Sequence, residues 1–424
     1  MDLVVEGRAF LGGRLVEAMV GIEGGKIARV AKSLPSSVVA GARRVQVRGV
    51  LLPGAVDAHV HAREPGLEHK ERVATATLAA LHGGVTTVLE MPNTAPAVTT
   101  RATFGDKRAR WQAAARVDWG LHAMVDRDLQ TFELGGAPVG YKLYLGGSTG
   151  AAGFPLGLLG SAARRATAAG RPLVVHAEHP DHLQEQDEAD DWRAHGKARP
   201  PEAEWAAIKV LAAYVPKGAR VVVAHATTAK GLKAARKAGL RVEVSPHHLL
   251  LDEREMDRQG PLAKVNPPLR GPKQREALWE AFAKGTADTL ASDHAPHALD
   301  EKDAPFDKAP SGMPGVETMM PLMMAKVKAK GLSLAVLVKA ACERPAQLFG
   351  LPKGQIAEGS DADLVAWDLT KVGVVEGAKL HSLCGWSAFE GHKAVWPHWA
   401  LLRGEPAMED GAALDTKGRE VAPA

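Results

Sequence analysis

The alternation of apolar and polar residues changes character near residue 50. Before this point, short apolar-polar runs are separated by the glycine pairs Gly12-Gly13 and Gly24-Gly25, which are typical of turns between β-strands. A helical period is missing from this stretch of sequence. We therefore predict a piece of a small β-domain, with strands at 3–5, 14–22, 26–30 and 44–47.

After residue 50, nearly continuous apolar runs alternate with amphipathic stretches for about 250 residues, the usual length of a (β/α)₈ barrel. Eight strands are predicted, at 50–61, 85–93, 116–125, 138–146, 171–178, 219–227, 240–248 and 287–297. Helices are predicted at 70–81, 99–115, 156–169, 201–214, 229–238 and 272–284. This order favours an α/β fold of the (β/α)₈ TIM-barrel type, although a doubly wound sheet has a similar pattern.

The C-terminal part returns to β-structure. A Met-rich helix is predicted to end at residue 330 and a second helix covers 334–349. Short strands follow at 354–356, 362–368 and 394–396. We predict that 1–50 and 352–424 form one small β-sandwich domain beside a barrel of residues 51–351.

Composition excludes several classes of protein. The 424 residues carry a formal net charge of +4 with no block of Lys and Arg, which argues against nucleic-acid binding. Two cysteines, Cys342 and Cys384, predict no disulfide framework and fit a reducing cytoplasm. Charged residues interrupt the first apolar run, so it does not resemble a signal peptide, and no stretch is apolar enough to span a membrane. A cytoplasmic protein with a small-molecule substrate is the expectation.

The first barrel strand carries the first candidate chemistry. Asp57, His59 and His61 are two residues apart, so on a strand they share one face. Two histidines at the end of a strand are well placed to bind a metal ion. Two unrelated surface histidines are the alternative for so short a motif.

Later strands supply more candidate ligands. The carboxyl ends of parallel strands converge on one mouth of a barrel, where active sites lie. Residues near these ends are Lys142, His176, His225 and Asp293, on the fourth, fifth, sixth and eighth predicted strands. Together with His59 and His61 they are enough for a binuclear metal site. Each alone is more often structural, but their shared position favours the site.

Lys142 is predicted to point into the barrel, because its neighbours Tyr141 and Leu143 point the other way. Burial lowers the pKa of a lysine and makes its amine nucleophilic. Such an amine can capture CO₂ as a carbamate, an anionic ligand able to bridge two cations. The alternative is a lysine that lies along the barrel wall with its charge at the rim.

Several motifs resemble the dihydroorotases of the amidohydrolase superfamily, in the subgroup with a carboxylated lysine. They are HVHAREPG (59–66), MPNT (91–94), KLYL (142–145) and SDHAPH (292–297), followed by SPHH (245–248), NPPLR (266–270) and GVET (315–318). The resemblance covers nearly the whole chain in the family's order. It implies a (β/α)₈ barrel with a flanking β-domain, two Zn²⁺ ions, and CO₂ held as a carbamate on Lys142.

The resemblance also implies an activity, the reversible cyclisation of N-carbamoyl-L-aspartate to L-dihydroorotate in pyrimidine synthesis. Asp293 would act as general base and then general acid. The residues implied to bind substrate are Arg63, Asn93 and His297 at the carboxylate and Asn266 at the ring. Glu178 is expected to hydrogen-bond a ligand histidine, whereas His248 and His294 are expected to have supporting roles. Thr149, in the loop 146–150, is either a closing contact or part of an ordinary turn.

Two alternatives stay open at this point. An allantoinase or hydantoinase would share the metal ligands but would need no cation for a substrate carboxylate, which Arg63 and Asn93 supply. A non-catalytic partner of aspartate transcarbamoylase would be free to lose ligands, and all six are present. The sequence leaves open both a homodimer and the association of a catalytic chain with aspartate transcarbamoylase.

Overall fold

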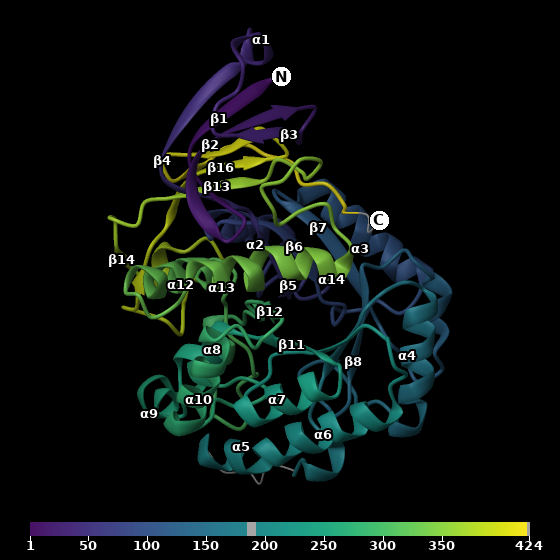
Figure 1. Cartoon of the computed structure of the whole chain (residues 1–424). Helices are drawn as coiled ribbons and strands as arrows, with labels where there is room; N and C mark the ends of the chain where they lie inside the picture. The colour runs from purple at the N-terminus through teal and green to yellow at the C-terminus, as the bar shows by residue number, and fades with distance from the viewer. Residues whose placement is uncertain (185–191, 422–424) are drawn as a thin grey trace.

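The computed structural model describes residues 1–184 and 192–421. Its centre is a parallel sheet of eight strands in the order β12-β11-β10-β9-β8-β7-β6-β5 (Figure 1). The strands are β5 (Ala55–Val60), β6 (Val85–Glu90), β7 (Asp118–Met124), β8 (Gly140–Tyr144), β9 (Leu173–His176), β10 (Val221–Val223), β11 (Arg241–Val244) and β12 (Thr289–Leu290). A parallel bridge between Val60 and His294, with the His61 amide donating to the His294 carbonyl at 2.8 Å, closes the barrel. The predicted (β/α)₈ barrel is confirmed.

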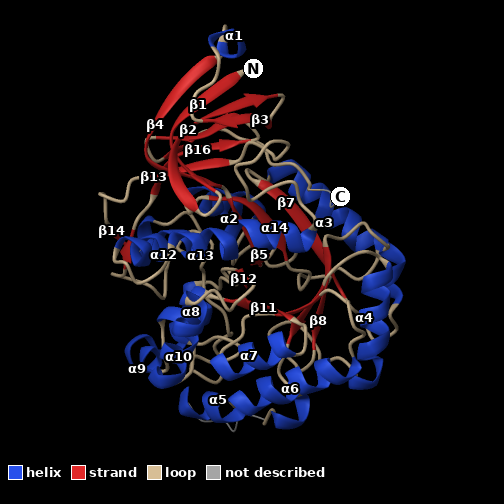
Figure 2. Cartoon of the chain, viewed as in Figure 1, coloured by secondary structure: helices blue, strands red, loops and turns tan. Residues whose placement is uncertain are grey.

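Helices surround this sheet (Figure 2). The longer ones are α2 (Val73–His82), α3 (Arg101–Ala114), α4 (Leu159–Ala168), α6 (Pro201–Tyr214), α7 (Ala229–Lys237), α10 (Pro272–Ala283) and α12 (Met319–Lys328). The shorter ones are α1 (Ser36–Val39), α5 (Trp192–Ala198), α8 (Pro246–Leu250), α9 (Arg254–Gln259), α11 (Leu299–Lys302), α13 (Leu334–Val338) and α14 (Arg344–Phe349). A π-helical turn, Lys339–Glu343, joins α13 to α14, so the predicted helix at 334–349 is continuous but contains a π-helical segment. No helix in the described part of the chain is long and apolar enough to cross a membrane.

Local sequence explains where the helices begin. The Thr100 and Thr228 side chains accept hydrogen bonds from the amides of Thr103 and Gly231, which caps α3 and α7. Pro201 opens α6 at a position where the missing N–H costs nothing. The apolar faces of these helices then bury against the outward side chains of the strands.

The second sheet joins the two ends of the chain, as predicted (purple and yellow strands in Figure 1). Its order is β18-β17-β16-β13-β4-β1-β2-β3. The strands are β1 (Leu3–Leu11), β2 (Arg14–Glu23), β3 (Lys26–Ala31), β4 (Arg43–Pro53), β13 (Leu364–Trp367), β16 (Pro397–Leu402), β17 (Glu405–Glu409) and β18 (Ala412–Ala413). The antiparallel pairing of β13 with β4 connects the N-terminal and C-terminal segments. A separate pair, β14 (Gly373–Val374) and β15 (Lys393–Ala394), lies outside both large sheets. The domain boundaries at 51 and 351 stay a prediction.

Most barrel strands are shorter than predicted, and the eighth, predicted at 287–297, is reduced to Thr289–Leu290. Three predictions differ in other ways. The run 50–61 divides at Gly54, so residues 50–53 end β4 and the barrel strand β5 begins at Ala55. A Cβ atom at Gly54 would lie 2.1 Å from the Thr86 hydroxyl, so only glycine fits between β4 and β5. The seventh strand ends at Val244, because Pro246 starts the short helix α8. Residues 354–356 form no strand.

Candidate metal centre and active site

The carboxyl ends of the barrel strands converge on one pocket. It is lined by nine of the ten predicted site residues, which are His59, His61, Arg63, Asn93, Lys142, His176, His225, Asn266 and Asp293. The tenth, His297, lies behind Arg63, with its Nε2 3.1 Å from the guanidinium Nη2. Side chains from separate strands therefore lie together, nine of them lining the pocket and His297 directly behind it.

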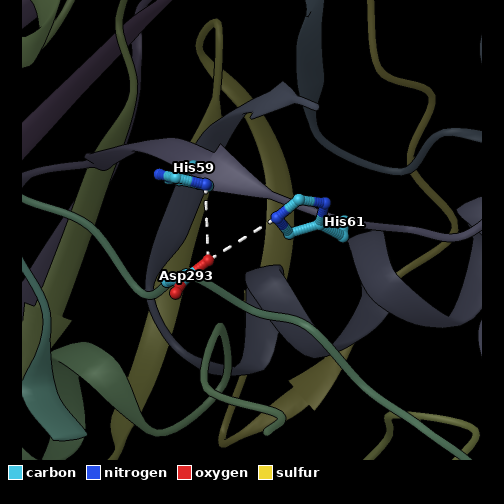
Figure 3. Close-up of side chains that lie close together, drawn as sticks. All are labelled: His59, His61 and Asp293. Atoms are coloured by element: carbon cyan, nitrogen blue, oxygen red, sulfur yellow. Dashed lines mark ion pairs between the residues drawn. The ribbon is translucent and has the colours of Figure 1, made fainter. Parts of the chain in front are cut away.

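One group of possible metal ligands comes from β5 and the segment after β12 (Figure 3). Asp293 Oδ1 lies 3.3 Å from His59 Nε2 and 3.5 Å from His61 Nε2, and the figure shows both rings directed at this carboxylate. On its other side, His59 Nδ1 lies 2.8 Å from Glu243 Oε1. An Nδ1–H that donates to Glu243 leaves the Nε2 lone pair facing Asp293, the arrangement common for metal-binding histidines.

A second group comes from β9 and the end of β10. His176 Nδ1 lies 3.1 Å from His225 Nε2. His176 Nε2 hydrogen-bonds Glu178 at 2.7 Å, the contact that the sequence predicted for Glu178. Although burial acts to raise it, the nearby Arg199 and His176 lower the pKa of Glu178 to about 2, so this carboxylate is charged and accepts the Nε2–H. The Nδ1 lone pair of His176 then faces His225, as two ligands of one cation would.

Lys142 lies between these groups. It is fully buried, and its Nζ is 3.4 Å from His59 Nε2, which confirms the inward orientation. Burial lowers the pKa of Lys142, although Glu243 and Asp293 act to raise it. This direction favours the neutral, nucleophilic amine over the ammonium. Four imidazoles, a carboxylate and this amine are a donor set that suits zinc.

The backbone at the site is held in an uncommon conformation. Arg63, His225 and Asp293 have φ angles of 63°, 36° and 48°, in the left-handed region that non-glycine residues rarely adopt. Such residues cost roughly 1–3 kcal/mol each and persist only where the surroundings fix them. Asp57 is one such support, because its Oδ1 accepts the amides of Ser292 at 3.0 Å and His59 at 3.2 Å. Asp57 thus ties β5 to the Asp293 segment and does not line the pocket.

The far side of the pocket is built to receive a polar ligand. Arg63 Nε donates to the Pro296 carbonyl at 2.9 Å, which orients the guanidinium. Asn93 Nδ2 reaches the Thr149 carbonyl at 3.4 Å, so the loop 146–150 lies across the pocket. The Oδ1 atoms of Asn93 and Asn266 are buried without a hydrogen-bond partner among the described residues. Buried amide oxygens of this kind are normally paired, so they are available to a bound molecule.

Sequence reasoning missed Glu243 and Tyr144. Glu243 is a single acidic residue between Val242 and Val244 on a buried strand, and that isolation was the available signal. Tyr144 lines the pocket two residues after Lys142, on the same face of β8. His248 and His294 have the supporting roles that were predicted, since His248 Nε2 bonds the Pro267 carbonyl and His294 Nδ1 accepts the Gly315 amide.

A substitution at Glu243 tests the orientation of His59. Glu243→Gln keeps the shape of the side chain but weakens its bond to His59 Nδ1, so we expect an affinity for Zn²⁺ about 10–100-fold lower. Zinc competition with a chromogenic chelator measures this change. Glu276→Gln, on helix α10, is the matched control and should leave the affinity unchanged. Equal affinities of wild type and Glu243→Gln would show that Glu243 does not orient the ligand.

Comparisons with known proteins place the chain in a family. Residues 50–394 match the family model described as "Amidohydrolase family". A protein of Halobacterium salinarum named dihydroorotase is 40% identical over 387 residues, which cover 88% of this chain and 89% of the relative. A dihydroorotase of Thermoplasma volcanium is 35% identical, with coverage of 99% and 98%.

Solved structures agree on the fold. The L-hydantoinase (dihydropyrimidinase) of Arthrobacter aurescens superposes with a TM-score of 0.93 at 29% identity and covers 99% of both chains. A D-hydantoinase superposes with a TM-score of 0.90 at 26% identity, covering 100% of this chain and 99% of the other. The chain belongs to the amidohydrolase family and, within it, to the dihydroorotases.

Proposed function

We propose that this chain is a cyclic amide hydrolase that interconverts L-dihydroorotate and N-carbamoyl-L-aspartate. The observation that carries the proposal is the position of Arg63, supported by His297, in the same pocket as the donor set of His59, His61 and Asp293. One end of the pocket fits a substrate carboxylate and the other fits an amide under attack. The names of the curated relatives support the same reaction.

The donor set fits a pair of zinc ions. His59 and His61 would hold one ion and His176 and His225 the other, with Asp293 beside the first pair and Lys142, as a carbamate, between the two. When bound, the two ions acidify a water molecule and polarise the amide carbonyl of the ring. The facing nitrogens of His176 and His225, 3.1 Å apart, support this assignment.

Asp293 is placed to move the proton. In hydrolysis, water adds to the ring carbonyl carbon, the bond from this carbon to the ring nitrogen breaks, and a proton must pass from the water to that nitrogen. Asp293 would accept the proton and then donate it to the leaving nitrogen. In cyclisation the same carboxyl group takes the proton from the ureido nitrogen and returns it as water leaves. The left-handed backbone at Asp293 and its support through Ser292 and Asp57 hold the carboxylate in position for both transfers.

Arg63 would bind the carboxylate of the substrate. Its Nε donates to the Pro296 carbonyl and its Nη2 contacts His297, which leaves Nη1 and the second N–H of Nη2 for a ligand. A guanidinium can hold a carboxylate through two parallel hydrogen bonds, and the burial of Arg63 strengthens these bonds. Asn93 and Asn266 offer amide groups to the carboxylate and the ring. A hydantoin without a carboxylate would make no use of Arg63, which argues against the hydantoinase alternative.

The role of Arg63 is tested by Arg63→Met with a matched pair of substrates. Dihydrouracil is dihydroorotate without the carboxylate. We expect kcat/KM for dihydroorotate to fall about 100-fold or more, because two charge-assisted hydrogen bonds of about 1.5–3 kcal/mol each are lost. The wild type should hydrolyse dihydrouracil more slowly than dihydroorotate, and Arg63→Met should change this slower rate little. The variant should retain its zinc. Arg14→Met, on the exposed side of β2, is the control. Unchanged kinetics with dihydroorotate would refute the assignment of Arg63.

Three further expectations from the sequence stay predictions: a homodimer, association with aspartate transcarbamoylase, and a location in the cytoplasm. The scaffold alternative requires no catalytic residues. All six proposed ligands are gathered here with their supporting carboxylates Glu178 and Glu243, which favours a catalytic chain.

A further inference from the structure

A second group of metal-binding side chains lies outside the active site. His82 is the last residue of α2, Glu317 precedes α12, and His381 belongs to the segment between β14 and β15. One possible ligand atom from each lies within 4.8 Å of the others. None of the three lines the active-site pocket, and all three line a separate cavity of about 270 Å³.

The hydrogen bonds of this group prepare the histidines as ligands. Glu317 Oε1 lies 2.8 Å from His381 Nδ1, and Glu317 Oε2 accepts the His381 amide at 2.7 Å. With the proton on Nε2, the Nδ1 lone pair of His381 faces this carboxylate, and an ion bound by Nδ1 and Oε1 would take the place of the contact between them. The His82 ring stacks on the His381 ring, with centroids 3.6 Å apart and planes at 7°. Burial, and then the neighbouring His381, lower the pKa of His82 to about 4, so this ring is neutral and offers a second lone pair.

The spacing and the charge of the group suit a divalent ion. Two atoms bound to one zinc ion at about 2.1 Å are at most about 4.2 Å apart. The group closes around an ion when the partly exposed His82 ring turns out of its stack on His381. The adjoining cavity has room for water ligands. Lys379, which lines the same cavity, pairs with Glu376 at 2.7 Å and leaves Glu317 to the histidines.

A comparison within the chain shows why this group differs from a buried ion-pair network. Asp118, Asp361 and Asp363 are equally close together. Their centre is filled by the Lys353 ammonium, whose Nζ lies 2.7, 2.8 and 2.6 Å from the three carboxylates. With Arg403 at Asp118 and Lys26 at Asp361, the three aspartates are paired with three cations of the chain, whereas the histidine group consists of two imidazoles and one carboxylate.

We propose that His82, Glu317 and His381 form a further binding site for a zinc-class divalent metal ion, separate from the catalytic centre. Two imidazoles and one carboxylate are a common zinc donor set, with water completing the coordination. The ion would fasten α2 of the barrel to the C-terminal segment around His381. Its role is structural, because no ligand of this site reaches the reacting pocket.

The test is a titration of the full-length holoenzyme with Zn²⁺ alone, followed by calorimetry and by metal analysis after gel filtration. We expect wild type to hold about one more equivalent than His82→Ala or His381→Ala, with dihydroorotate turnover unchanged in both variants. His398→Ala is the matched control, because this partly exposed histidine does not line the cavity and its Nε2 contacts the Arg48 carbonyl at 3.2 Å. It should bind as many equivalents as wild type.

Equal metal content in wild type and both alanine variants would overturn the proposal. If an alanine variant also loses the catalytic metal, the test is repeated with Glu317→Gln. This variant keeps a hydrogen-bond acceptor for the His381 amide but removes the charge. An affinity for the additional Zn²⁺ at least 10-fold lower supports the site, and an unchanged affinity refutes it. The count is independent of the substrate, so failure of the dihydroorotase proposal would not alter the result.

Discussion

Asp293→Asn is expected to lower kcat for dihydroorotate by at least about 1,000-fold. General acid-base catalysis by a positioned side chain contributes roughly 10²–10⁴-fold, and this carboxyl group would serve in both proton transfers. Asparagine has the same shape and can still occupy the position beside His59 and His61, 3.3 and 3.5 Å away. Steady-state assays in both directions, with zinc analysis of each preparation, measure the effect.

The control for Asp293→Asn is Asp303→Asn, an exposed aspartate at the end of α11. It should leave kcat and zinc content unchanged. The decisive pattern is a large loss of kcat with substantial zinc retained and KM little changed. If Asp293→Asn retains more than a tenth of the wild-type kcat, another group carries the proton.

Lys142→Ala is expected to lose metal and activity together, with kcat at least about 1,000-fold lower. Lys142 is buried in the pocket that both histidine pairs line, 3.4 Å from His59 Nε2, and its proposed carbamate would bridge the two ions. Without a bridging anion, the four imidazoles would face two cations with Asp293 as the one remaining carboxylate of the donor set. We expect the zinc content to fall by about one equivalent or more.

The dependence of activity on bicarbonate tests whether Lys142 acts as a carbamate or as a simple amine. Metal-free wild type reconstituted with zinc should gain activity faster and more completely in bicarbonate than in CO₂-depleted buffer. Lys142→Ala should show no response to bicarbonate, whereas a short carboxylic acid such as acetate should restore part of its activity by replacing the bridging anion. Wild-type activity that is independent of CO₂ at every metal concentration would refute the carbamate. Lys284→Ala, at the end of α10, is the control.

The fold was predictable where a local pattern determines it. Helix α6 has the predicted bounds 201–214, because a proline starts it and its apolar period is regular. The site residues were predictable for a geometric reason, since parallel strands bring their carboxyl ends to one mouth. His59, His176 and His225 are distant in sequence but could be assigned to one pocket for this reason.

Other features depend on contacts between distant segments. The run 50–61 divides at Gly54, where Thr86 packs against the backbone, a contact that an apolar run of sequence does not reveal. Glu243 acts through its bond to His59, 184 residues away. The position of the loop 146–150 depends on contacts of Thr149 with Asn93 and Ser311, residues distant in sequence, so it required the structure.

A cyclic amide that carries a carboxylate is the proposed substrate of this site. The most direct measurement is kcat/KM of the zinc- and bicarbonate-replete wild type for dihydroorotate and for dihydrouracil under identical conditions. We predict a preference for dihydroorotate of about 100-fold or more, corresponding to about 3 kcal/mol of transition-state binding by the carboxylate. Equal or better turnover of dihydrouracil, or no hydrolysis of dihydroorotate by the metal-loaded protein, would contradict the account.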